Sequence, residues 1–219
     1  MDIIPFAVIF DMDGVLVDSN PFHKKAIHHF CEEHQLSVTE RELNEKVYGR
    51  TNKEWINYLF GGQLTPAEIN KYEKEKESLY RSLHGPSMVP VAGLIPFLGL
   101  LRANNIPMAV GTSAPPENAD FILNKIGALP YFKTILNSSH IDKGKPDPEI
   151  YIKTARQLDL SPSQCIIFED SLSGVVAGKT AGSKVVGVCT THSPEELSMT
   201  DVTIADFRGL DLPFLQRLM

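Results

Sequence analysis

From residue 88 onward, short apolar runs alternate with helical patterns, and this alternation limits the fold more than any other feature of the chain. The strand candidates are 107–112, 133–136, 164–169, 184–188 and 202–205. The helical patterns lie near 93–104, 116–126, 148–158 and 172–181. Because the strand candidates are apolar and β-branched over their length, they suit strands that are covered on both faces. Alternation of this kind predicts right-handed crossovers and a parallel sheet.

A long segment without any strand pattern follows the first strand candidate, residues 6–10. Residues 20–84 contain only helical patterns. The expected helix starts are Asn20-Pro21, Thr39…Glu42, Thr51…Glu54 and Thr65…Glu68. The expected helix stops are Gly61-Gly62 and Gly85-Pro86. We therefore expect an α/β protein whose Rossmann-like core domain comprises residues 1–17 and 88–219. Residues 18–87 are expected to form an inserted four-helix cap domain.

The composition limits the partners that this chain can have. Its 219 residues are 42% hydrophobic and 22% charged, as in soluble globular proteins, and its net charge of -6 argues against nucleic acid or an anionic membrane. The longest apolar stretch, 91–101, is shorter than the roughly 20 residues that cross a bilayer. The first residues lack the basic region of a signal peptide, and the three cysteines lack disulfide or zinc spacing. We expect a cytoplasmic monomer or small homo-oligomer.

Four polar clusters follow the strand candidates. They are Asp11-Met12-Asp13-Gly14, Gly111-Thr112-Ser113, Lys143-Gly144-Lys145-Pro146 and Glu169-Asp170-Ser171. Three of them come directly after a strand, and the cluster that contains Lys145 follows its strand by a loop. Because ligands of an open parallel sheet bind outside the carboxyl ends of the strands, we expect the four clusters to meet at a single site.

Asp11 stands at the end of the first strand candidate, where a carboxylate has no packing role. A carboxylate there can attack phosphorus and form an acyl phosphate, which divides one difficult transfer into two easier steps. Asp13, two residues further on, can protonate the leaving oxygen and then take a proton from the next nucleophile. Gly14 permits the tight turn that brings the two carboxylates to one side. The sequence therefore predicts Asp11 as nucleophile and Asp13 as general acid and base.

Two carboxylates beside a phosphoryl group require positive charge. A hard cation with oxygen ligands supplies it, Mg²⁺ is the usual choice, and Glu169 and Asp170 at another strand end can complete its ligands. Lys145 offers a compact positive charge to Asp11 and to the phosphoryl oxygens, and Thr112 offers a hydroxyl donor. Each cluster alone also fits a turn, a helix cap or a solvated loop, so the combination is what favours a site.

The clusters resemble the motifs of the haloacid dehalogenase superfamily in order and in residue type. Asp11-Met12-Asp13-Gly14-Val15-Leu16-Val17-Asp18-Ser19 is similar to the first motif, Thr112 to the second, Lys145 to the third, and Glu169-Asp170-Ser171 with Gly174 to the fourth. The resemblance covers essentially the whole chain. It implies that Asp11 and Asp170 bind Mg²⁺ by their side chains and Asp13 by its backbone carbonyl, while Glu169 is a ligand or stands just behind the ligands. Asp13 also excludes the dehalogenase branch.

Within the superfamily, the chain looks most like the sugar-phosphate phosphatases and β-phosphoglucomutase. His23 and Lys76 fall where a cap histidine and a cap lysine act in the mutase. Each lies on an apolar helix face. If His23 has no such role, it is a buried histidine whose hydrogen bonds are satisfied within the protein. Lys76 either snorkels to water or points into the cleft. Where the mutase has a phosphate-binding arginine, this chain has Asn52. Arg50 or Lys53 can substitute for it, and Ser113 after the second motif is a further candidate contact with the substrate.

Three functions fit these residues. The first is a Mg²⁺-dependent phosphatase that hydrolyses a small phosphorylated metabolite, with a sugar phosphate preferred, through an aspartyl phosphate on Asp11. The second is a hexose phosphomutase, in which a sugar hydroxyl instead of water accepts the phosphoryl group. The third is a receiver-like signalling module, which would need neither Asp13 in a proton-transfer position nor a large helical insertion. Because the phosphate-binding arginine is replaced by Asn52, simple hydrolysis is favoured.

Overall fold

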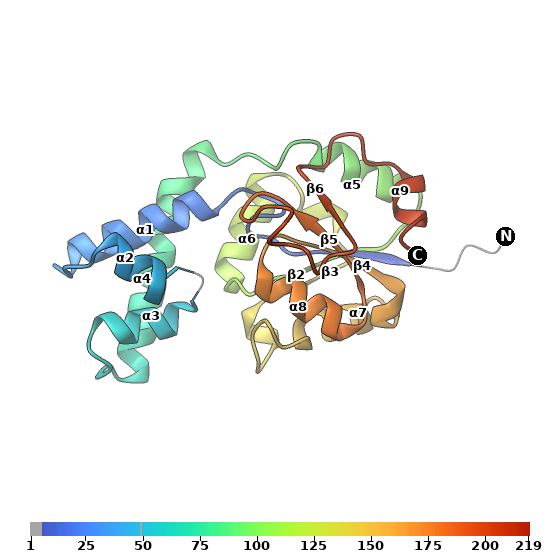
Figure 1. The fold of residues 1–219 in the computed structure, drawn as a ribbon. Coiled ribbons are helices and arrows are strands. Elements are labelled where there is room, and N and C mark those ends of the chain that lie inside the picture. The colour runs from blue at the N-terminus through green and yellow to red at the C-terminus, as the bar shows by residue number, and fades with distance from the viewer. Residues whose placement is uncertain (1–5, 49) are drawn as a thin grey trace. The chain divides into compact units, whose positions relative to one another are not determined.

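The computed structural model describes residues 6–48 and 50–219, which form two compact units (Figure 1). An α/β unit combines the residues up to Asp18 with Met88–Met219, and a helical unit comprises Ser19–Ser87. The start of the N-terminal stretch, residues 1–5, and Gly49 of the predicted cap loop lie outside the described residues.

The α/β unit is built on a six-stranded parallel sheet, as the strand–helix alternation predicts. Its strands are β1 (Ala7–Phe10), β2 (Met108–Gly111), β3 (Thr134–Leu136), β4 (Cys165–Glu169), β5 (Lys184–Val188) and β6 (Val202–Ile204). Each lies within one of the predicted ranges, and the order across the sheet is β3-β2-β1-β4-β5-β6. The predicted α/β class and Rossmann-like parallel sheet are therefore confirmed.

Helices connect the strands. They are α5 (Leu94–Ala103), α6 (Pro116–Lys125), α7 (Glu149–Gln157), α8 (Leu172–Ala181) and α9 (Leu212–Gln216), with short 3₁₀ turns at Leu129–Tyr131, Ser138–His140 and Pro162–Gln164. The first four match the predicted helical patterns. The sequence analysis did not include α9, which is only five residues long and begins at an Asp211 cap that accepts a hydrogen bond from the Phe214 amide at 2.8 Å.

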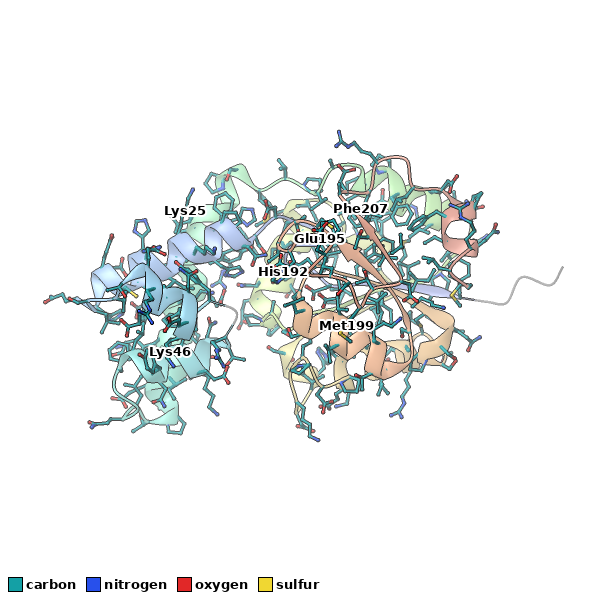
Figure 2. The ribbon with its side chains drawn as sticks, viewed as in Figure 1. Lys25, Lys46, His192, Glu195, Met199 and Phe207 are labelled. Carbon is teal, nitrogen blue, oxygen red and sulfur yellow. The ribbon has the colours of Figure 1, made fainter. Side chains whose placement is uncertain are left out.

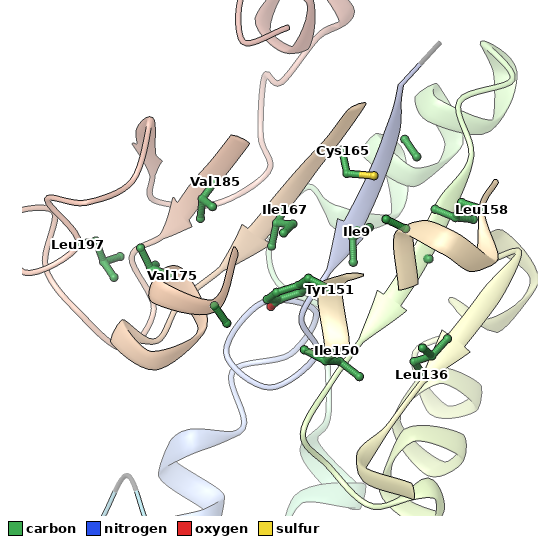
Figure 3. Close-up of a cluster of buried hydrophobic side chains, with 14 residues drawn as sticks. Ile9, Leu136, Ile150, Tyr151, Leu158, Cys165, Ile167, Val175, Val185 and Leu197 are labelled. Atoms are coloured by element: carbon green, nitrogen blue, oxygen red, sulfur yellow. The ribbon is translucent and has the colours of Figure 1, made fainter. Parts of the chain in front are cut away.

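The strands send alternate side chains to the two faces of the sheet. On one face, Ile9, Ile167 and Val185 pack in a buried cluster with side chains from α7 and α8 (Figure 3). On the other face, Phe10 stacks on Phe168 with ring centroids 5.2 Å apart. Burial on both faces explains why the strands are apolar throughout their length.

An aromatic cluster on the second face joins distant parts of the chain. Phe97 from α5 lies 5.6 Å from the ring of Phe168, and Phe207, labelled in Figure 2, lies 5.3 Å from the same ring. Phe207 comes from the segment between β6 and α9. The cluster therefore fixes α5 and the C-terminal segment against the strands that precede the candidate site.

The order of the strands reverses beside β1. From β1 the chain moves outward through β2 to β3, then returns to the other side of β1 with β4 and continues to β5 and β6. Phe10 pairs in register with both Val110 and Phe168, and the Asp11 amide donates to the Phe168 carbonyl at 2.9 Å. The residues that follow β1, β2 and β4 therefore share one edge of the sheet, where ligands of such folds bind.

The helical unit contains α1 (Asn20–Glu33), α2 (Glu40–Lys46), α3 (Asn52–Leu59) and α4 (Pro66–His84), followed by a 3₁₀ turn at Gly85–Ser87. Both halves of the capping box form at Thr51 and at Thr65, and the Thr39 side chain accepts a hydrogen bond from the Glu42 amide. The prediction of an Asn20 cap is wrong in detail, because Ser19 is the N-cap and Asn20 is already helical. Within the described parts of the chain, no helix has the length and hydropathy needed to span a membrane.

The buried aromatic cluster predicts a large loss of stability when Phe97 is truncated. We expect Phe97→Ala to lower the free energy of unfolding by about 3–5 kcal/mol, because the neighbouring rings cannot fill the cavity that it leaves. Urea denaturation followed by circular dichroism measures this loss. The control is Met199→Ala, at an apolar side chain that is 57% exposed (Figure 2), which should change the stability by less than about 0.5 kcal/mol. Equal losses in the two variants would contradict the packing argument.

Candidate active site

A tight turn directly after β1 presents Asp11 and Asp13. The Leu16 amide donates to the Met12 carbonyl at 2.8 Å, and the Gly14 amide donates to the Val17 carbonyl at 2.8 Å. Gly14 has a φ of +76°, which favours glycine. A Cβ atom on Gly14 would also overlap the carboxylate of Asp170. Glycine is therefore required here both by the backbone and by a side chain from another strand.

Lys145 links two strand ends, although it lies on the loop between β3 and α7. Its Nζ atom is 2.7 Å from Oδ1 of Asp11 and 2.6 Å from Oε1 of Glu169. Burial alone would lower the pKa of Lys145, but the two adjacent carboxylates outweigh it and raise the pKa above its ordinary value. The lysine is therefore a fixed, protonated cation in the site.

Glu169 is fully buried at the end of β4 and accepts hydrogen bonds on both carboxylate oxygens. Its Oε2 atom accepts from the amides of Asp170 and Ser171, both at 3.0 Å, and from the Ser171 hydroxyl at 3.1 Å. Burial raises the pKa of Glu169, but Lys145 and these donors outweigh it and hold the pKa below its usual value. A Cβ atom on Gly174 would overlap this carboxylate, so the glycine of the fourth motif makes room for it.

Three buried carboxylates gather at this edge of the sheet: Asp11, Glu169 and Asp170 each offer an oxygen within 4.8 Å of the others. Burial, reinforced by the charge of Glu169, raises the pKa of Asp11 to about 7 against the opposing effect of Lys145. Burial, together with the charges of Glu169 and Asp11, raises the pKa of Asp170 well above its usual value. One lysine does not balance three carboxylates, and an all-oxygen set of this kind suits a hard divalent cation.

Three side chains that the sequence analysis did not single out belong to the same cluster. The Tyr151 hydroxyl donates to Oε1 of Glu169 at 2.6 Å, the Thr191 hydroxyl donates to Oδ2 of Asp170, and the Thr190 hydroxyl donates to the Gly14 carbonyl. The threonine pair follows β5 by one residue, so the rule of polar residues after strands could have found it. Tyr151 lies in the first turn of α7, on the buried face of that helix, and no such signal marks it.

The cluster after β2 contributes one buried hydroxyl. Thr112 is 1% exposed, its amide donates to the Leu136 carbonyl at 3.0 Å, and its Oγ1 accepts from the Ala114 amide at 3.1 Å. These bonds fix the hydroxyl at the end of β2, beside β1. Ser113 is exposed on the same turn.

In the helical unit, Lys76 and His23 lie together. The Lys76 side chain is 4% exposed, and its Nζ atom is 2.9 Å from Nδ1 of His23 and 2.8 Å from Oε1 of Glu77. The ring of His23 stacks on Tyr80 with centroids 3.8 Å apart. Lys76 therefore does not snorkel to water, which was one of its two expected orientations. It is instead part of a buried polar network.

Asn52 belongs to the same network. Its Nδ2 atom donates to Oε1 of Glu77 at 2.6 Å, and its Oδ1 atom accepts from Nε1 of Trp55 at 3.1 Å. The Asn52 side chain is thus committed to hydrogen bonds within the helical unit. Arg50 and Lys53 are exposed.

A parallel α/β unit that carries a lysine and three buried carboxylates at its strand switch point defines a class of enzyme that handles anionic substrates with the help of a metal. The chain belongs to the haloacid dehalogenase-like hydrolase family, whose model matches residues 8–188. Enzymes of this family generally use Mg²⁺, and the acidic cluster fits such an ion.

Curated relatives include both phosphatases and a mutase. The chain is 33% identical over 189 residues to the β-phosphoglucomutase of Bacillus subtilis, with 83% of this chain and 82% of the relative covered. It is 30% identical over 213 residues to the validoxylamine A 7'-phosphate phosphatase of Streptomyces hygroscopicus subsp. limoneus, with 94% and 96% covered. It is 28% identical over 211 residues to the chloroplastic 5-amino-6-(5-phospho-D-ribitylamino)uracil phosphatase of Arabidopsis thaliana, covering 96% of this chain but only 57% of that protein.

A solved structure extends the similarity to the whole fold. The family IA, variant 3 hydrolase of Entamoeba histolytica superposes with a TM-score of 0.90 at 29% identity, covering 97% of this chain and 98% of that one.

The contact between Gly14 and Asp170 predicts that Gly14→Ala abolishes metal binding. The new methyl group would displace the Asp170 carboxylate, so calorimetry should detect no Mg²⁺ binding by the variant. The matched control is Gly127→Ala, because Gly127 also has a positive φ but has open space around its Cβ position. The control should lose about 1 kcal/mol of stability and retain Mg²⁺ binding. Normal Mg²⁺ affinity in Gly14→Ala would contradict the assignment of the cluster as a metal site.

Proposed function

We propose that this protein is a Mg²⁺-dependent phosphatase that hydrolyses a small phosphorylated metabolite, preferably a sugar phosphate, through an aspartyl phosphate on Asp11. The observation that carries the proposal is the convergence of Asp11, Lys145, Glu169 and Asp170 at the carboxyl ends of β1 and β4. A nucleophilic carboxylate needs an adjacent cation to approach an anionic phosphate, and this cluster offers both a lysine and a place for a metal.

In the first step, an oxygen of Asp11 attacks phosphorus, the bond to the leaving alcohol breaks, and Asp13 gives the alcohol its proton. In the second step, Asp13 removes a proton from water, which attacks the same phosphorus and releases inorganic phosphate and the free Asp11 carboxylate. The two residues are near enough for the charge of Asp13 to raise the pKa of Asp11. Asp13 thus serves as acid and then as base, as general acid–base catalysis requires.

The other residues of the site stabilise charge and hold the substrate. Lys145 pairs with Asp11 and stands beside the transferring phosphoryl oxygens, and the Thr112 hydroxyl donates to the same oxygens. The side chains of Asp11 and Asp170 and the backbone carbonyl of Asp13 would hold Mg²⁺, which would supply positive charge beside the phosphoryl group. Glu169 supports this arrangement beside the ion, and Ser113 offers a further hydroxyl at the rim.

We assign the choice of substrate to the helical unit. His23, Lys76 and Arg50 are the proposed contacts with the part of the substrate that is not phosphoryl. The site is proposed for a small phosphorylated molecule, without nucleic acid or membrane as a partner and in a cytoplasmic monomer or small homo-oligomer.

Hydrolysis is favoured over the mutase reaction by one feature of the helical unit. A mutase must hold the second phosphate group of a bisphosphate while that molecule reorients in the site. Holding this group requires a cation that is not already paired with a carboxylate. The Asn52 amide donates to Glu77, and the charge of Lys76 is balanced by the same carboxylate. The phosphatase names of several relatives agree with hydrolysis, whereas the name of the Bacillus subtilis relative keeps the mutase as the competing reaction.

The nucleophile assignment predicts the effect of Asp11→Asn. With an aryl phosphate and Mg²⁺, we expect kcat to fall by at least about 10³-fold, because an amide cannot form the covalent intermediate. Removal of the metal with EDTA should abolish turnover by the unmodified protein, and added Mg²⁺ should restore it. Asp120→Asn, at an exposed aspartate on α6, is the control and should retain full activity. Substantial turnover by Asp11→Asn would rule out this mechanism.

The fate of the phosphoryl group separates the two reactions. When hexose phosphates are incubated with the protein and a hexose bisphosphate, we expect free phosphate to appear in proportion to the sugar phosphate consumed. A panel of sugar phosphates, nucleotides and phosphoglycolate, measured by the same phosphate release, then identifies the preferred substrate. Interconversion of isomers without net phosphate would establish the mutase instead.

A further inference from the structure

Tyr151 occupies an unusual position for a polar side chain. It is fully buried on α7, inside the apolar cluster that packs under β1 and β4 (Figure 3). Ring atoms of Tyr151 lie 3.4 Å from the place where a Cβ atom of Gly111 would stand, so the ring packs beside the end of β2. The hydroxyl reaches Oε1 of Glu169 at 2.6 Å. A phenylalanine would fill the apolar space equally well, so the packing does not explain the hydroxyl.

The hydroxyl completes the hydrogen bonding of Glu169. Oε1 accepts from Tyr151 and from Lys145, each at 2.6 Å, while Oε2 accepts from the turn that begins α8. A carboxylate has about four lone-pair positions, and these donors use both oxygens fully. Glu169 is thus held in one orientation by donors to both of its oxygens.

The ring of Tyr151 also contacts the lysine. The Nζ atom of Lys145 lies 4.9 Å from the ring centroid, within the range of a cation–π interaction. Hydroxyl and ring therefore act on the two partners of one ion pair: the hydroxyl fixes Glu169, and the ring limits where the ammonium can move. The same ammonium is 2.7 Å from Oδ1 of Asp11.

We propose that Tyr151 is a positioning residue of the phosphoryl-transfer site, which holds Glu169 and, through it, keeps the Lys145 ammonium against Asp11. The proposal rests on the proposed function, since Lys145 is taken to assist attack by Asp11. In this proposal Tyr151 acts through Glu169 and Lys145 and not directly on the substrate or the metal. Among the described residues, removal of its hydroxyl leaves Lys145 as the only donor to Oε1, so that Glu169 and the ammonium can move together away from Asp11.

The experiment compares Tyr151→Phe with the unmodified protein. We expect kcat for an aryl phosphate to fall about tenfold, the effect of losing one hydrogen bond to a charged group, and KM to stay within about twofold. Calorimetry should give a Mg²⁺ affinity within about threefold of the unmodified protein, because Asp11 and Asp170 keep their places. The control is Tyr131→Phe, at a tyrosine whose ring centroid lies 4.4 Å from the Arg102 guanidinium carbon. This variant should leave kcat, KM and the Mg²⁺ affinity unchanged.

A double-mutant cycle separates positioning from a merely structural role. If Tyr151 acts through Glu169, Tyr151→Phe combined with Glu169→Gln should lose little more kcat than Glu169→Gln alone. Multiplicative losses would overturn the proposal, as would unchanged kcat in Tyr151→Phe. A loss of Mg²⁺ affinity that saturating Mg²⁺ repairs would also overturn it. Melting curves confirm that the variants are folded at the assay temperature. Absence of Mg²⁺-dependent turnover in the unmodified protein would instead reject the proposed function itself.

Discussion

The ion pairs of Lys145 are the interactions on which the candidate site depends. Three carboxylates buried within 4.8 Å of one another repel, and burial adds a desolvation penalty to each charge. The ammonium bridges Asp11 and Glu169 and offsets part of this cost. The remaining excess of negative charge is the physical reason why this site suits a divalent cation. Burial, reinforced by the neighbouring carboxylates, raises the pKa values of Asp11 and Asp170.

The fold provides this arrangement by connecting residues that are far apart along the chain. Lys145 and Asp11 are separated by 134 positions, and they meet because the strand order reverses beside β1. Two glycines create the space for the carboxylates: Gly14 faces Asp170, and Gly174 faces Glu169. The aromatic cluster beneath the site holds β1 and β4 together just before their functional residues, so that the carboxylates of Asp11, Glu169 and Asp170 stand at the ends of rigid strands.

In the helical unit, by contrast, the buried charges of one ion pair cancel. There the buried Lys76 is matched by the buried Glu77, and the amide of Asn52 adds a neutral donor. A buried pair of this kind orients its members but leaves no net charge to attract a second anionic group. Among the described residues, the excess of buried negative charge therefore belongs to the α/β unit.

The sequence by itself determined the parallel α/β class, the four polar clusters and the secondary structure apart from details such as the short helix α9, because periodicity, caps and strand ends are local signals that survive without tertiary contacts. Only the tertiary structure decided that Tyr151 reaches Glu169, that Thr191 donates to Asp170, and that Lys76 turns inward to Glu77 instead of outward to water. Each of these contacts joins separate elements or depends on how one element is covered by another. The register between strands and the packing of a helix on the sheet are set by the whole core at once, so no short stretch of sequence contains them.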